Sequence, residues 1–133
     1  MSQENVEIVR QVFAAFNSED IGRILALTHP ELEVEIRPEI SAEPDTYVGH
    51  EGMRRYFQTF QDAMDEIRFQ PERFWDAGDA VVVALRLTAK GRQTSIPVEQ
   101  RSAGVWTIRD GKVVGVSAYV SASQALEAVG LAE

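Results

Sequence analysis

The chain has 133 residues, of which 44% are hydrophobic and 26% are charged, the proportions of an ordinary globular domain. It contains no cysteine, which excludes a disulfide framework and thiolate chemistry and favours the cytoplasm. Its net charge of −8 opposes binding to nucleic acid or to anionic membranes. We therefore expect one cytoplasmic domain spanning residues 1–133, with no nucleic-acid partner and no membrane partner.

The first half of the chain has mainly helical periodicity. Apolar residues recur every three or four positions in 4–17 and again after His50, whereas 32–37 alternates apolar with charged residues. The segment 38–49 contains Pro38, Pro44 and Gly49, which favours a loop. The expected elements are a helix over 4–17, a helix from Ser18 or Asp20 that ends at 28–30, a strand over 32–37, a loop over 38–49 and a helix over 50–66.

The second half alternates with the period of strands. Four strands are expected over 67–75, 80–89, 95–109 and 112–121, followed by a short helix that ends near Gly130. Helices therefore precede a set of antiparallel strands. This order predicts an α+β fold with helices on one face of a curved sheet.

The last two strands should form a hairpin, because Asp110-Gly111 suits a two-residue type I′ turn. A regular register then sets Arg109 opposite Lys112 and Val105 opposite Val116. We expect the valine-rich side to face the helices, since burying a valine stabilises a fold by about 1.5–3 kcal/mol. Two residues of the same stripe, Glu99 and Arg101, would then project into the interior and line a pocket.

These positions predict the candidate site. Glu99 would accept a proton, and Arg101 would bind a carbonyl or carboxylate of the ligand; the alternative is a structural ion pair at the rim. The residues expected to contact the ligand are Arg37, Tyr47, Tyr56, Ala103, Val116 and Ala118. For Tyr56, half-buried packing is an alternative role. His29 and His50 lie in different segments without ligand spacing, so no metal site is expected.

Three stretches resemble the nuclear transport factor 2-like superfamily, and in particular its SnoaL-like branch of polyketide cyclase-like and ketosteroid isomerase-like proteins. They are "IVRQVFAAFNSEDIGRILALTHPELEVEIRP", "YVGHEGMRRYF" and "VWTIRDGKVVGVSAYV". The resemblance implies a cone-shaped antiparallel sheet wrapped around N-terminal helices, usually dimerising through the outer face of the sheet. It also implies pocket chemistry near Arg37. However, the tyrosine and the aspartate of ketosteroid isomerase would fall at Val12 and near Arg37, so that catalytic set is missing.

The sequence therefore predicts a pocket for a small, mostly apolar molecule with a carbonyl or hydroxyl group. Catalysis would be cofactor-free acid–base chemistry of the isomerase, cyclase or hydrolase kind, with Glu99 as base. The alternative is a non-catalytic ligand-binding or dimerisation domain. In either case we expect a homodimer that needs no cofactor.

Overall fold

The computed structural model describes residues 2–36 and 45–131. This part of the chain forms four helices and six strands. In chain order they are α1 (Ser2–Asn17), α2 (Ile21–Ala26), β1 (Thr28–Ile36), β2 (Asp45–Val48), α3 (Gly49–Ala63), β3 (Met64–Asp76), β4 (Ala80–Gly91), β5 (Pro97–Arg109), β6 (Lys112–Tyr119) and α4 (Ala122–Ala128).

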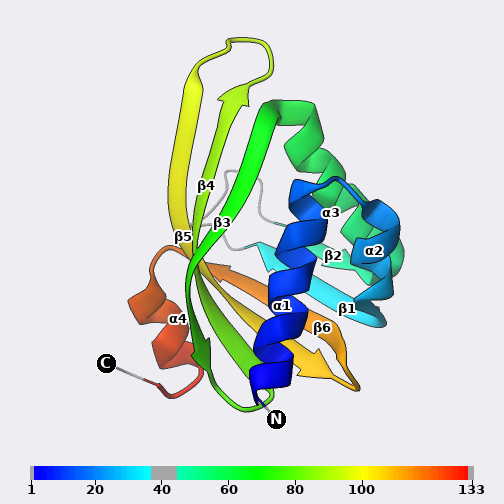
Figure 1. Cartoon of the computed structure of the whole chain (residues 1–133), viewed down its shortest axis with the longest axis vertical. Helices are drawn as coiled ribbons and strands as arrows, with labels where there is room; N and C mark the ends of the chain where they lie inside the picture. The colour runs from blue at the N-terminus through cyan, green and yellow to red at the C-terminus, as the bar shows by residue number, and fades with distance from the viewer. Residues whose placement is uncertain (1, 37–44, 132–133) are drawn as a thin grey trace.

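The strands form one curved sheet in the order β2-β1-β6-β5-β4-β3. Neighbouring strands are antiparallel except for β1 and β6, which run parallel. Helices α1 and α3 lie along one side of the sheet, and the hairpin of β4 and β5 extends beyond the end of α1 (Figure 1). The expected α+β architecture, with N-terminal helices against a curved sheet, is confirmed.

Most expected elements are present, with three corrections. Helix α2 ends at Ala26 and strand β1 begins at Thr28, whereas the helix was expected to end at 28–30 and the strand to begin at 32. Residues 45–48 were expected to be loop but form strand β2, which pairs with β1; residues 38–44 lie outside the described part. The third helix ends at Ala63, three residues before the expected 66, because Met64 is already extended and starts β3. Asp20 caps α2 by accepting a hydrogen bond from the Arg23 amide, as expected for a helix N-cap.

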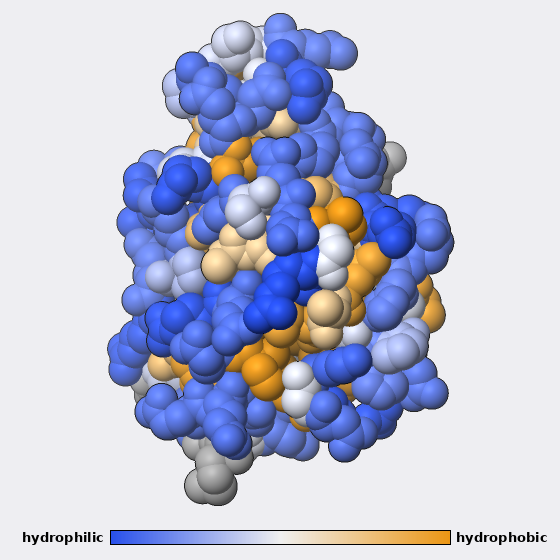
Figure 2. Space-filling model, turned by 45° about the vertical axis from the view of Figure 1, so that its right-hand side comes forward, coloured by the Kyte–Doolittle hydropathy of each residue, from blue (hydrophilic) through white to orange (hydrophobic). Residues whose placement is uncertain are grey.

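The main core lies between the helices and the inner face of the sheet. It contains the apolar side of α1 together with inward residues of every strand from β1 to β6 except β2, and Val9, Val12 and Ile24 are fully buried there. Figure 2 shows the helical side of the molecule, where hydrophilic residues predominate and hydrophobic surface is visible between them in the middle. No helix of the described part is long and apolar enough to cross a membrane.

A second, smaller cluster covers part of the opposite face. Helix α4 places Ala125 and Leu126 against Val82 of β4 and Ala103 of β5. Its N-cap is Ser121, whose hydroxyl accepts a hydrogen bond from the Gln124 amide. The outer face of the sheet is therefore apolar under α4.

The β5–β6 hairpin corrects the expected register. Asp110 and Gly111 have φ angles of 55° and 75°, which matches the expected type I′ turn, and Arg109 does pair with Lys112. After Ile108–Val113, however, the next pairs are Thr107–Gly115 and Trp106–Val116. Val114 is thus an extra residue in β6, a β-bulge. Because side chains alternate along a strand, this one-residue shift reverses which stripe of β5 shares a face with Val116.

Candidate functional site

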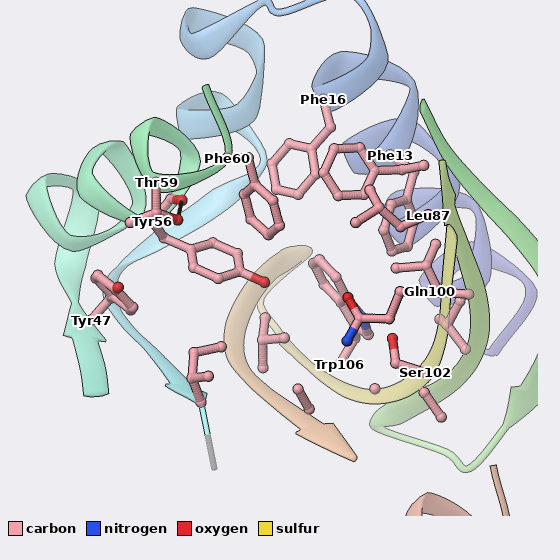
Figure 3. A pocket seen from close by; sticks show the side chains of 18 residues that line it. Phe13, Phe16, Tyr47, Tyr56, Thr59, Phe60, Leu87, Gln100, Ser102 and Trp106 are labelled. Atoms are coloured by element: carbon pink, nitrogen blue, oxygen red, sulfur yellow. Dashed lines mark hydrogen bonds between the residues drawn. The ribbon is translucent and has the colours of Figure 1, made fainter. Parts of the chain in front are cut away.

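A cavity of about 320 Å³ opens between α3 and the inner face of the sheet. Helix α1 closes its inner end with Phe13 and Phe16, and α3 forms one wall with Tyr56, Thr59 and Phe60. Strands β4, β5 and β6 form the opposite wall, and Ile36 and Tyr47 bring β1 and β2 to its edge. Figure 3 shows these side chains converging on the space from both sides.

The inner part of the cavity is aromatic. The Phe13 ring lies 5.0 Å from the Trp106 ring in an edge-on arrangement, and the Phe16 and Phe60 rings lie 5.2 Å and 5.3 Å from Phe69. Edge-on and tilted pairs of this kind pack more favourably than face-to-face pairs. The cavity therefore has walls suited to a flat, apolar ring system.

Two tyrosines stand on the α3 side. The Tyr47 and Tyr56 rings are 5.4 Å apart, and Tyr56 also contacts Phe60 edge-on at 5.1 Å. Gly52 allows β2 to approach α3 here, because a Cβ at that position would lie only 2.7 Å from the Tyr47 carbonyl carbon. The Tyr56 hydroxyl points into the cavity (Figure 3).

The Tyr56 hydroxyl stays protonated, and is therefore a hydrogen-bond donor, over the whole physiological pH range. Burial, with a smaller contribution from Tyr47, raises its pKa from 10.0 to about 12. A phenol with this pKa remains protonated near neutral pH, so it donates a hydrogen bond but does not accept a proton as a base.

The sheet side carries a polar stripe on β5. Gln100, Ser102, Gly104 and Trp106 alternate along the strand and all line the cavity, as residues on one face of a strand should. Gln100 and Ser102 reach in from the side opposite Tyr56 (Figure 3). The cavity therefore has hydrogen-bonding groups on two opposing walls.

Five of the residues expected from the sequence border this cavity: Tyr47, Tyr56, Ala103, Val116 and Ala118. Ala103 also belongs to the cluster beneath α4, so it contributes to the wall between two inward-facing neighbours. Arg37 lies outside the described residues. What any of these side chains does to a ligand stays a prediction.

Glu99 and Arg101 do not line the cavity, and the expectation that they face the interior is wrong. The Val114 bulge turns Gln100, Ser102, Gly104 and Trp106 inward instead. Consequently Glu99 and Arg101 project from the opposite face of β5, where both are exposed.

On that face the two residues pair with different partners. Arg86 Nε donates to Glu99 Oε2 at 2.7 Å, and its guanidinium also donates to Gln70. Arg101 pairs with Glu72 at 3.3 Å. The hydrogen bond from Arg86 lowers the pKa of Glu99. Glu99 and Arg101 thus belong to separate surface ion pairs, and not to the single ion pair at the rim that was the expected alternative.

None of the described side chains that line the cavity carries a carboxylate, an imidazole, an amine or a guanidinium. The site can therefore bind through apolar contact and neutral hydrogen bonds. Sequence reasoning missed Gln100, Ser102, Gly104 and Trp106 as site residues, because it placed this stripe on the outer face. The tryptophan at the end of this polar stripe could have indicated burial, because it is the largest side chain on the strand.

Comparisons with known proteins agree on the fold. The family model of the SnoaL-like domain matches residues 9–116, and no curated protein matches the chain. An NTF2-like protein from Burkholderia xenovorans is 28% identical, with a TM-score of 0.76 over 97% of each chain. A protein described as a SnoaL-like polyketide cyclase, from Jannaschia, is 17% identical, with a TM-score of 0.79 over 100% of this chain and 95% of that one.

A third similar structure is TerC co-crystallized with polyporic acid, which is 23% identical with a TM-score of 0.79 over 95% of this chain and 98% of TerC. The helices, the curved sheet and a family match over most of the length lead to one conclusion: the chain belongs to the SnoaL-like domain family.

Proposed function

We propose that the protein binds one small, uncharged, mostly aromatic or alicyclic molecule that carries a carbonyl or hydroxyl oxygen. The observation that carries this proposal is a cavity of about 320 Å³ whose described lining is aromatic and aliphatic, with only neutral hydrogen-bonding groups. Cavities of this size hold small organic ligands. Each 100 Å² of apolar ligand surface removed from water contributes about 2.5 kcal/mol to binding.

The neutrality of the lining supports an uncharged ligand. Burying a carboxylate or an ammonium ion without an opposite charge costs several kcal/mol, and no described lining residue supplies one. TerC, a structural neighbour, was co-crystallized with polyporic acid, which supports a small organic molecule as the class of ligand.

The binding role is favoured over acid–base catalysis by Glu99. That carboxylate lies on the outer face in an ion pair with Arg86. Tyr56, whose pKa burial raises to about 12, stays protonated near neutral pH and so does not act as a base. The isomerase, cyclase or hydrolase alternative would need a base that the described lining does not supply.

The proposal is tested with two variants on neighbouring residues of β6. Ala118 lines the cavity. Ser117 faces a second groove, the outer groove between β1, β2, β5 and β6, where its hydroxyl donates a hydrogen bond to Glu35. A thermal-shift screen of neutral steroid-like, terpenoid and polyketide-like compounds should raise the melting temperature of the wild type and of Ser117→Phe. Ala118→Phe, which fills the cavity, should abolish the shift. Absence of any binder, or equal binding by both variants, would refute the proposal.

The homodimer and the cytoplasmic location belong to the same proposal. The surface that supports a dimer is the outer groove between β1, β2, β5 and β6, where Val48 is 59% exposed. Light scattering coupled to size-exclusion chromatography should give twice the chain mass of 14.8 kDa. A monomer at all concentrations would remove this part of the proposal without affecting the pocket.

A further inference from the structure

The inner face of the β5–β6 pair contains a small gap in an otherwise bulky wall. Gly104 on β5 pairs directly with Ala118 on β6, and both line the cavity. The next pair along is Trp106 with Val116. Two of the smallest residues thus lie side by side next to the largest one. This stretch of the wall therefore lacks a bulky side chain beside the indole; we call it the Gly104 notch, and it is bordered by Ser102, Gly104, Trp106 and Ala118.

The Trp106 indole lies over this notch with its nitrogen toward Gly104. A Cβ built on Gly104 would lie 3.0 Å from Trp106 Nε1 and 3.5 Å from Cδ1. Because 3.0 Å is tighter than ordinary carbon–nitrogen contact, an alanine at 104 would force the indole to move. Glycine here leaves room for the indole N–H at the edge of the notch.

The indole N–H has no protein partner in the described part of the chain. Trp106 is only 5% exposed, yet none of the hydrogen bonds among the described residues involves Nε1, and no fully buried side-chain nitrogen or oxygen there lacks a partner. The nitrogen must therefore be accessible from the cavity. Because the rest of the Trp106 side chain is buried, this N–H can find a partner only in the cavity, so the site favours a ligand that supplies a hydrogen-bond acceptor.

We propose that the Gly104 notch is the subsite that holds the ligand's oxygen, with Trp106 Nε1–H as the donor and the Ser102 hydroxyl beside it. This inference rests on the proposed function and refines it, because it assigns the polar end of the ligand to the sheet. The ligand class is then an uncharged cyclic ketone or quinone, whose oxygen accepts and does not need to donate. The ring system extends from the notch toward Phe13 and Phe60.

The test uses 1-tetralone and its hydrocarbon analogue tetralin, which share a ring skeleton and differ in the carbonyl. Binding is measured by titration calorimetry and ligand-detected NMR on the wild type and on Trp106→Phe. Losing one neutral hydrogen bond should weaken tetralone by about 3- to 10-fold while tetralin stays within about 2-fold. If Trp106→Phe weakened the binding of both compounds equally, Trp106 would contribute only packing. The proposed oxygen subsite would then be wrong, whereas the proposed binding cavity would still stand.

Two glycine variants provide a second measurement that does not remove the tryptophan. Gly104→Ala fills the notch, whereas a Cβ at Gly115 would meet only ordinary contacts, the nearest at 3.6 Å. Tetralone should bind more weakly to Gly104→Ala and unchanged to Gly115→Ala; equal binding to both would overturn the notch.

The indole protons give a direct readout on the folded wild type. The chain has two tryptophans, and Trp75 lies outside the cavity. Saturation with tetralone should move the Trp106 N–H resonance downfield and leave that of Trp75 in place. A Trp106 resonance that tetralin moves equally would contradict the assignment. If neither compound binds, the proposed ligand class is wrong, and the proposed subsite is wrong as well.

Discussion

The two faces of strand β5 show how differently one strand can be used. Its inward stripe of Gln100, Ser102, Gly104 and Trp106 borders a cavity whose described lining residues are all uncharged. Its outward stripe begins with Glu99 and Arg101, which pair with Arg86 and Glu72 in solvent. Neighbouring residues, about 3.3 Å apart along the strand, thus meet opposite environments. The position of the charges follows from register and does not indicate a catalytic site.

The inner face should be the more sensitive to substitution. Phe13 is 3% exposed and contacts the rings of Phe16, Phe69 and Trp106. Phe13→Ala should lower the free energy of unfolding by about 3–5 kcal/mol, because it removes buried ring surface and leaves a cavity. Urea denaturation measures the change. As a control, Arg101→Ala on the outer face should leave the urea midpoint nearly unchanged; a similar shift for both would contradict the contrast between the faces.

On the outer face, substitutions should destabilise the protein as much as those on the inner face only beneath α4. Leu126 is 2% exposed and packs against Val82 and Ala103. Leu126→Ala should destabilise the protein by about 2–5 kcal/mol, and hydrogen exchange should show faster opening of α4. The neighbouring exposed residue Glu127 gives the matched control, Glu127→Ala, for which no change in exchange is expected. If both variants behaved alike, α4 would not be a packed element.

A smaller effect is expected where α3 meets β2 at the cavity edge. Gly52→Ala would place a Cβ 2.7 Å from the Tyr47 backbone, so either the strand or the helix must move. The expected loss is about 1–3 kcal/mol of unfolding free energy, together with weaker ligand binding as Tyr47 moves. Gly115→Ala, which has room for a methyl group, is the control in the same denaturation series. A stable Gly52→Ala would mean that β2 is not held against α3.

The smallest effect is expected for the outer ion pair. Because Arg86 lowers the pKa of Glu99, this pair stabilises the fold above the ordinary glutamate value of 4.5 and is lost as the pH falls through the lowered pKa. The difference in melting temperature between the wild type and Glu99→Gln should therefore be small at neutral pH and vanish in acid. Ligand binding should be unchanged in Glu99→Gln. A loss of binding would show that Glu99 contributes to the binding site after all.

The sequence was sufficient for the fold and for part of the cavity. Hydrophobic periodicity placed α1 and the four long strands, and the Asp-Gly pair placed the turn at 110–111. Val116 and Ala118 border the cavity as expected. The bulge at Val114 could not be predicted from the sequence. Valine and small residues occupy both faces of β6, so the pattern does not show where inward and outward positions exchange. The side of β5 was therefore inferred from valine burial, while the larger Trp106 is buried on the other side.

The Val114 bulge also bears on how residues are compared between members of this family. A relative without the extra residue in β6 would turn the other stripe of β5 toward its pocket, even if its β5 residues were identical to those of this chain. Equivalent β5 positions in such proteins should be identified by the β6 residue that each one pairs with, as Trp106 pairs with Val116 here. Counting residues back from the turn would give the wrong position. An alignment that leaves no gap at position 114 would transfer a pocket residue onto the solvent side.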